Sequence, residues 1–280
     1  VHLIGLASSG FSTGMVVGNF EWLAALCLVL LGLVFAPFYF RSRVATLPEF
    51  LEKRFSAGSR TMLAVMGVFG ALFVHIGVSL YSGGVVVDEL LHPGSAGVDR
   101  GSIIASILIV STLTVLYTVL GGLKAVVVTE SIQTVLLLLG ALAVTVAGVL
   151  ALGDSATAAN QGLVEHLQTR TRPDQLSMVQ PSGGYAWYAM LLGYPVLGIW
   201  YWCSDQTIVQ RVLGAKTERD AQIGPLFAGL LKVLPPLLMV LPGVFAYVLF
   251  EDRIAANPDS TKQATTAERR GVPDLSLIHI

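Results

Sequence analysis

Residues 132–152 read IQTVLLLLGALAVTVAGVLAL and contain no charged side chain. A helix of roughly 18 or more such residues crosses about 30 Å of hydrocarbon, at about 1.5 Å per residue. The stretch lacks the apolar and polar alternation of a barrel strand, and an open sheet edge cannot face lipid. It therefore predicts a membrane-spanning α-helix.

Apolar runs of similar length lie on both sides of this stretch. They cover residues 22–40, 62–87, 102–120, 185–202 and 223–250, the last interrupted by Lys232. Residues 1–20 are apolar but rich in Gly and Ser, and they predict the remainder of a seventh helix. The fold class predicted is all-α, a polytopic membrane protein. Because Val1 already lies in an apolar stretch with no charged leader, we expect a fragment.

Composition supports a membrane protein. Of 280 residues, 54% are hydrophobic and 12% are charged, about half the roughly 25% charged residues of soluble domains. This composition excludes an ordinary soluble enzyme and a disordered chain. The formal net charge of −1 argues against nucleic acid as a partner. Cys27 and Cys203 lie in or beside apolar runs and imply no disulfide framework.

Basic residues predict the orientation, because short cytoplasmic loops carry an excess of Lys and Arg. The loops 41–61, 121–131 and 203–222 hold Arg41, Arg43, Lys53, Arg54, Arg60, Lys124, Arg211, Lys216 and Arg219. The alternate loop 88–101 carries only Arg100 against three acids. We therefore place the three basic loops in the cytoplasm of a plasma (inner) membrane protein. The N-terminal edge, the loop 153–184 and the polar tail 251–280 are expected outside. Residues 275–280 are either a packed apolar piece or, as we favour, a non-native remnant.

Charged residues at membrane depth are costly and commonly mark a pathway. Lys232 lies near the middle of its run, too deep for its side chain to reach the interface, and this favours a functional role. Glu21 stands near a helix start, where either the helix dipole or a site accounts for it. His75 is more typical of a core histidine. Glu130, between Thr129 and Ser131, fits either helix capping or an ion path.

A second signal is the group of helix-breaking residues Gly193, Pro195 and Gly198, since discontinuous helices hold solutes and ions in secondary transporters. A simple proline kink is the alternative. The aromatic cluster at 200–202 suits stacking on a sugar ring, although aromatic belts at membrane interfaces are commoner. Metal-binding, nucleophile-elbow and phosphate-loop motifs are absent from the sequence, so we expect no enzyme and no primary pump.

Three motifs carry a resemblance. They are LPEFLEKRF at 47–55, YTVLGGLKA at 117–125 running on to TESIQ at 129–133, and WYWCSDQTIVQR at 200–211 followed by Ala215 and Lys216. The chain resembles the sodium:solute symporter family, and within it the sodium/glucose cotransporter branch. This resemblance implies a partial leucine-transporter-like inverted-repeat fold. Residues 1–152 would hold core helices 1 to 5, and 185–250 core helices 6 and 7.

The resemblance also implies roles for particular residues. Five match sugar-contacting positions: His2, Glu21, Tyr201, Trp202 and Lys232. Leu6 and Phe20 match an outer hydrophobic gate, and Tyr201 an inner gate stacked on the sugar. Glu130 matches an Asp of the cation path. A carboxylate with a lysine offers the acceptors and donors that a neutral polyol needs.

Gly198 departs from the family, which carries Asn or Thr there, so we expect one hydrogen bond to the solute to be missing or supplied by water. The family's sodium ligands fall outside this chain, and no metal ligand is assigned. The function implied is sodium-coupled symport of a glucose- or galactose-like sugar, with sodium as coupling ion, the lipid bilayer as environment and no organic cofactor. The alternatives are a symporter of inositol, sialic acid or a carboxylate, and a non-coupled sugar sensor.

Overall fold

The computed structural model describes residues 2–92 and 100–256, which form helices joined by turns. Within this part no strand occurs, and the all-α prediction is confirmed. Among the described residues, four helical stretches are long and apolar enough to cross a membrane: Met15–Arg41, Ala57–Asp88, Arg100–Ala158 and Glu218–Phe250. They contain five of the six predicted spans. The sixth, 185–202, forms only 12 residues of α-helix and 5 of π-helix.

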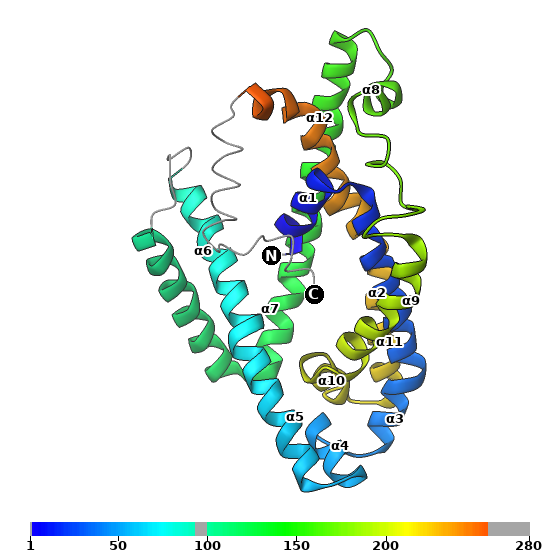
Figure 1. Cartoon of the computed structure of the whole chain (residues 1–280). Helices are drawn as coiled ribbons and strands as arrows, with labels where there is room; N and C mark the ends of the chain where they lie inside the picture. Colours follow the sequence, from blue (N-terminus) through cyan, green and yellow to red (C-terminus); the bar gives the residue numbers. More distant parts are fainter. Residues whose placement is uncertain (1, 93–99, 257–280) are drawn as a thin grey trace. The chain divides into compact units, whose positions relative to one another are not determined.

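The described chain divides into two compact units, residues 64–140 and residues 2–63 with 141–256. The first contains the end of α5 (Ala57–Phe69), the π-helix η3 (Gly70–Ile76), α6 (Gly77–Leu91) and the first part of α7 (Arg100–Ala158). Gly122 interrupts α7 with φ 58° and ψ −158°, and the ribbon turns back within this unit (Figure 1).

The predicted loop at 121–131 is wrong, because residues 123–131 are helical. The reversal needs one residue with positive φ, which glycine adopts at little cost. The hydroxyls of Thr129 and Ser131 donate to the carbonyls of Ala125 and Val127 at 3.0 and 2.7 Å. Their polar groups are thereby satisfied inside the helix, so this polar segment has no need of a loop.

The second unit holds the remaining elements. They are α1 (His2–Ser12), the 3₁₀-helix η1 (Met15–Gly18), α2 (Asn19–Leu30), the π-helix η2 (Leu31–Phe35), α3 (Ala36–Arg41), α4 (Leu47–Arg54), α8 (Leu163–Arg170), α9 (Trp187–Gly198), the π-helix η4 (Ile199–Cys203), α10 (Gln206–Leu213), α11 (Glu218–Leu231), the π-helix η5 (Pro236–Val240) and α12 (Leu241–Ala256). In Figure 1, α2 runs beside α9 and α11.

Helices α1 and α12 approach closely in this unit. A Cβ on Gly243 would lie 1.9 Å from the carbonyl oxygen of Ala7, and one on Gly10 would lie 2.2 Å from that of Val240. Small residues of this kind let helix backbones pack closely in membranes. Around the contact, the buried side chains of Leu6, Val16 and Val240 form one hydrophobic cluster.

The expectation of one helix over residues 1–20 is wrong. Helix α1 ends at Ser12, and Gly14 takes φ 102° before η1 begins at Met15. A Cβ on Gly14 would meet the backbone oxygen of Gln175 at 2.3 Å, so only glycine fits this turn. The next span therefore begins at Met15 rather than at residue 22, which places Glu21 inside the span.

The loop after α8 fixes the turn between α1 and η1. Gln175 is fully buried; its side chain donates to the carbonyl of Phe11 at 3.1 Å, and its own carbonyl accepts from the amide of Met15 at 2.8 Å. Arg172 donates to the carbonyl of Ser12 at 2.5 Å and lies 5.4 Å from the centre of the Tyr247 ring. These bonds satisfy the backbone groups that the break leaves without helical partners.

The opposite end of this unit carries the LPEF motif. Thr46 caps α4 by accepting from the amide of Glu49 at 3.3 Å, while Glu49 accepts from the amide of Ala45 at 2.8 Å. Pro48 stands in the first turn, where a helix needs no amide donor. The amide of Leu47 donates to Gln206 at 2.8 Å, joining this motif to the start of α10.

The break predicted near residues 193–198 lies further on. Helix α9 continues through Pro195 and Gly198 and passes directly into η4. The chain leaves the helix at Ser204, with φ −135°, and Asp205 caps α10 by accepting from the amide of Thr207 at 2.8 Å. The capping Asp thus sets the start of α10, whereas the glycines and the proline do not end α9.

Candidate functional site

Two charged side chains meet inside the second unit. The Lys232 ammonium lies 2.6 Å from Glu21 Oε2, and Nε2 of His2 lies 3.1 Å from Oε1 of the same carboxylate. The Glu21 side chain is 7% exposed and that of Lys232 17%, against 49% for His2. Three residues that are widely separated in the sequence thus form one charged cluster, with the carboxylate at its buried centre.

Local sequence explains where each charge lies. The turn at Gly14 starts a helical stretch that carries Glu21 to the first turn of α2. Helix α11 ends at Leu231, and Lys232 caps it, with its amide donating to the carbonyl of Ala228 at 3.0 Å. The lysine therefore lies at a helix C-terminus, where a positive charge is favoured. The prolines at 235 and 236 follow, and proline cannot continue the ladder of helical hydrogen bonds.

An aromatic ring lies against the lysine, and two further rings pack around that ring. Its Nζ lies 4.9 Å from the centre of the Trp202 ring, within the range of a cation–π contact. The Trp202 ring packs edge-to-face on Tyr201, with centroids 5.0 Å apart and planes at 89°. Trp202 Nε1 donates to the hydroxyl of Tyr194 at 3.3 Å. The lysine is thus bounded by a carboxylate on one side and a flat aromatic face on another.

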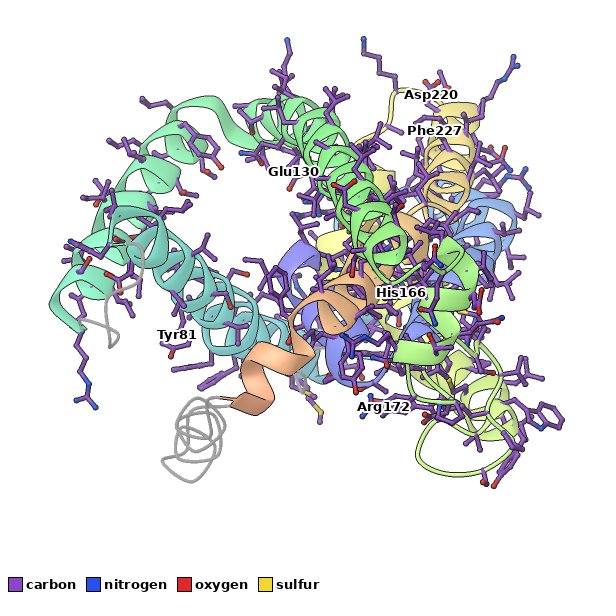
Figure 2. The ribbon with its side chains drawn as sticks, turned by 90° about the horizontal axis from the view of Figure 1, so that it is seen from above. Tyr81, Glu130, His166, Arg172, Asp220 and Phe227 are labelled. Carbon is purple, nitrogen blue, oxygen red and sulfur yellow. The ribbon has the colours of Figure 1, made fainter. Side chains whose placement is uncertain are left out.

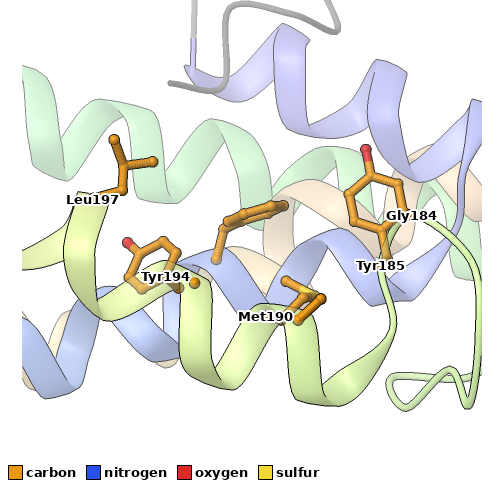
Figure 3. Close-up of a pocket in the computed structure, with 8 residues that line it drawn as sticks. Gly184, Tyr185, Met190, Tyr194 and Leu197 are labelled. Carbon is orange, nitrogen blue, oxygen red and sulfur yellow. The ribbon is translucent and has the colours of Figure 1, made fainter.

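A cavity of about 220 Å³ lies beside these aromatic residues (Figure 3). It is lined by Phe20, Gly184, Tyr185, Ala189, Met190, Gly193, Tyr194 and Leu197. Tyr194 and Leu197 stand at one end and Tyr185 at the other (Figure 3). Tyr194 belongs both to the cavity wall and, through Trp202, to the surroundings of Lys232.

The structure brings together most of the residues that the sequence singled out. His2, Glu21, Trp202 and Lys232 form one chain of contacts, and Tyr201 joins it through Trp202. Phe20 lines the cavity and packs 5.8 Å from the Tyr194 ring. The gate role of Phe20 and Tyr201 stays a prediction.

Leu6 shares a hydrophobic cluster with Phe20, whereas Glu130 lies elsewhere. Leu6 is 2% exposed and belongs to the hydrophobic cluster around α1 and η5. Glu130 stands half-buried on α7 in the other compact unit (Figure 2). Their roles as gate and cation path stay predictions. Among the described residues, no three His, Cys, Asp or Glu side chains converge as a metal site would require.

Sequence reasoning missed Tyr194. It lies eight positions before Trp202, and at the roughly 100° per residue of an α-helix this would place the two side chains about 80° apart. The π-helix η4 has more residues per turn, so the angle shrinks and both side chains face the same way. The repeated aromatic residues of α9 and η4 were visible in the sequence, but the π-helix was not.

Gly198 lies directly against this arrangement. A Cβ there would lie 2.6 Å from Sγ of Cys27 and 2.7 Å from Cε1 of Tyr194. The polar residue that the resemblance implies at this position would therefore not fit beside Tyr194. The missing side chain is replaced by the tyrosine ring, one helical turn earlier in the chain.

The chain is similar to several known proteins. The model of the sodium:solute symporter family matches residues 1–279. Sodium/glucose cotransporter 2 of Rattus norvegicus is 35% identical over 91% of this chain and 40% of its own length. Sodium/glucose cotransporter 1 of Ovis aries is 34% identical over 98% and 43%. Sodium/myo-inositol cotransporter of Mus musculus is 35% identical over 94% and 38%. This chain thus spans about two fifths of the length of these relatives.

A solved structure of a Na⁺-coupled sialic acid symporter, in a substrate-bound outward-open state, matches the fold with a TM-score of 0.69. The match is 18% identical in sequence and covers 91% of this chain and 51% of that one. It confirms a partial leucine-transporter-like fold for this multi-pass membrane protein. Because the family model matches almost the whole chain, the chain belongs to the sodium:solute symporter family.

Proposed function

We propose that the protein carries a neutral sugar, of the glucose or galactose type, across the membrane together with sodium. The observation that supports this most strongly is the 2.6 Å pair of Glu21 and Lys232 beside the ring of Trp202. A buried ion pair contributes little net stability, because desolvation of both charges offsets their attraction. A functional role for the pair therefore explains its presence better than a structural one.

The chemistry of the pair suits a polyol. The Glu21 carboxylate only accepts hydrogen bonds and the Lys232 ammonium only donates them, whereas each sugar hydroxyl does both. In the closed pair the two groups satisfy each other. We infer that solute hydroxyls enter between them, so that each charge exchanges one partner for another. The faces of Trp202 and Tyr201 would then cover the apolar face of the sugar ring.

The transport cycle follows from the family. Sodium would stabilise an outward-open state. The solute would pass Leu6 and Phe20, bind to His2, Glu21 and Lys232, and leave as Tyr201 moves and one helix bundle rocks against the other. Glu130 would lie on the path of the cation.

We also propose a membrane location, an orientation in that membrane and a non-enzymatic role. The protein would lie in the plasma (inner) membrane with the basic segments 41–61, 121–131 and 203–222 in the cytoplasm and the N-terminal edge outside. The polar tail is expected outside, although residues 257–280 lie outside the described part. The roles proposed for these residues need binding and movement only, and the named relatives are cotransporters, so we propose no enzymatic activity.

One alternative substrate has specific support. A relative named as a sodium/myo-inositol cotransporter is 35% identical, the same value as for the glucose cotransporter 2 relative. A cyclic polyol without a ring oxygen presents the same kind of hydroxyl groups to Glu21 and Lys232. Sialic acid or another carboxylate would add a negative charge next to Glu21, which makes these solutes less suited to the site.

Uptake of labelled galactose by proteoliposomes that contain the full-length protein tests the proposal. We expect uptake to fall to background when potassium replaces sodium, and unlabelled galactose to compete better than myo-inositol. Stronger competition by myo-inositol would identify the alternative substrate. Binding of galactose without sodium-dependent uptake would instead identify a sensor.

A further inference from the structure

The cavity beside the charged cluster has few polar side chains. Phe20, Ala189, Met190 and Leu197 supply apolar walls, and the hydroxyls of Tyr185 and Tyr194 are the polar side-chain groups among its lining residues. Of these two, Tyr194 stands at the end next to Leu197 and is the one bonded to Trp202 (Figure 3). It is therefore the polar group of the cavity that is connected to the proposed solute site.

The hydroxyl of Tyr194 is oriented by two contacts. It accepts the indole N–H of Trp202 at 3.3 Å, and the ring lies 5.8 Å from that of Phe20. A tyrosine hydroxyl that accepts one hydrogen bond still has its own proton to donate. Because Trp202 also lies over Lys232, a solute held by the lysine would lie close to this hydroxyl.

The orientation of the ring depends on Gly198. Since a Cβ at position 198 would lie 2.7 Å from Cε1 of Tyr194, any other residue displaces the tyrosine or Cys27. The position of the Tyr194 ring thus depends on Gly198. Because Gly198 has no side chain, the ring and hydroxyl of Tyr194 occupy the space beside it.

We propose that Tyr194 is a specificity-determining residue, whose hydroxyl binds a hydroxyl group of the solute at the cavity end of the site. The inference rests on the proposed function and deepens it. The cavity, at about 220 Å³, is smaller than the roughly 300 Å³ at which pockets for drug-sized ligands begin. A cavity of this size has room for the hydroxyl-bearing edge of a monosaccharide rather than for a larger solute as a whole.

Tyr194→Phe in the full-length protein provides the test. The matched control is Tyr188→Phe, because Tyr188 stands exposed on the same helix and does not line the cavity. For sodium-dependent galactose uptake we expect KM to rise about threefold to tenfold in Tyr194→Phe, the loss of one neutral hydrogen bond. We expect kcat to change little and the control to match the wild type.

Monodeoxy galactoses separate a direct contact from a structural effect. One analogue should have the same KM in wild type and Tyr194→Phe, because the hydroxyl that the tyrosine binds is already missing. Gly198→Ser should raise the KM for galactose similarly, and adding Tyr194→Phe to it should cause no further rise. A KM ratio that is equal for galactose and every analogue would overturn the specificity role.

The two proposals fail in different ways. If the wild type takes up neither sugars nor myo-inositol with sodium, the proposed function is wrong and this inference with it. If the wild type transports galactose and Tyr194→Phe has the wild-type KM for all analogues, only the role of Tyr194 is wrong. Thermal unfolding of each variant, compared with the control, shows whether the fold has been kept.

Discussion

Two ion pairs of the second unit have the same length and different surroundings. Lys232 lies 2.6 Å from Glu21, with side chains 17% and 7% exposed, and Arg60 lies 2.6 Å from Glu52, with side chains 54% and 37% exposed. Exposed pairs contribute little, because water and salt screen them. A buried charge that loses its partner is strongly unfavourable. The two pairs therefore agree in distance and differ in burial, so the loss of a partner is expected to be costly only for the buried pair.

The surroundings also differ in chemistry. The exposed pairs, which include Arg41 with Glu218 and Lys53 with Glu49, lie at the end of the unit that holds α3, α4 and the start of α11. Charge there suits solvent and orientation in the membrane. The buried pair instead has an aromatic face on the lysine and a histidine on the carboxylate. Variants at both places test whether this difference corresponds to function.

The largest effect is expected for Lys232→Ala. It leaves the buried carboxylate of Glu21 without its closest donor and removes the donor to the solute, so galactose uptake should fall by about 10- to 100-fold. The control is Lys216→Ala, since Lys216 is exposed in the turn before α11. Uptake rates normalised to protein in the liposomes provide the measurement. Equal uptake by the two variants would remove the distinction between buried and exposed lysines.

An intermediate effect is expected for His2→Ala. His2 contacts the same carboxylate at 3.1 Å, but its side chain is 49% exposed. The loss of one partly exposed hydrogen bond should raise the KM for galactose by about threefold to tenfold. Initial rates over a range of galactose concentrations measure it. If His2→Ala lowered galactose uptake as much as Lys232→Ala does, the size of the effect would not depend on how exposed the side chain is.

A smaller effect is expected for Glu218→Gln. Arg41 Nη2 lies 2.7 Å from Glu218 Oε1, and the Arg41 side chain is 73% exposed. Uptake should stay within about twofold of the wild type, because exposed pairs of this kind contribute little. Uptake at low and high salt checks the result. A tenfold decrease would show that this surface pair takes part in the transport cycle.

The smallest effect is expected at Glu49, and it depends on pH. The amide of Ala45, and then the ammonium of Lys53, hold the pKa of Glu49 below its ordinary value. The carboxylate therefore stabilises the start of α4 above the pKa of the unfolded chain, and this contribution disappears as pH falls through the lowered pKa. Glu49→Gln should slightly lower Tm at neutral pH and leave it unchanged in acid. A larger difference in acid than at neutral pH would contradict this sign.

Much of the fold and part of the site could be predicted from the sequence. Long uncharged runs predict the helical class, and Lys232 stands out as a charge within such a run, because lipid tolerates so few of them. Glu21 was singled out by the resemblance to the family, and the structure places it inside the span. The helix breaks were misplaced. Gly14 ends α1 through its contact with Gln175, more than 150 residues away, and Asp205 rather than Gly198 marks the break after η4.

Tyr194 shows a second kind of limit. Its contact with Trp202 depends on a π-helix, which no periodicity in the sequence indicated. The crowding at Gly198 likewise depends on the packing of Cys27 and Tyr194. Residue type and family motifs therefore singled out Glu21 and Lys232, whereas helix geometry and tertiary packing determine which neutral side chains lie beside them.

The most direct measurement is kcat/KM for sodium-dependent uptake of galactose and of each monodeoxy galactose, by the wild type and by Lys232→Met. Methionine keeps an unbranched side chain and removes the ammonium. If the Glu21–Lys232 pair binds the solute, the kcat/KM of at least one analogue should be about tenfold below that of galactose in the wild type. In the variant it should be less than about twofold below, because the deleted hydroxyl and the deleted ammonium bind each other. If every analogue loses the same factor in both proteins, Lys232 does not contact the solute and the pair is structural.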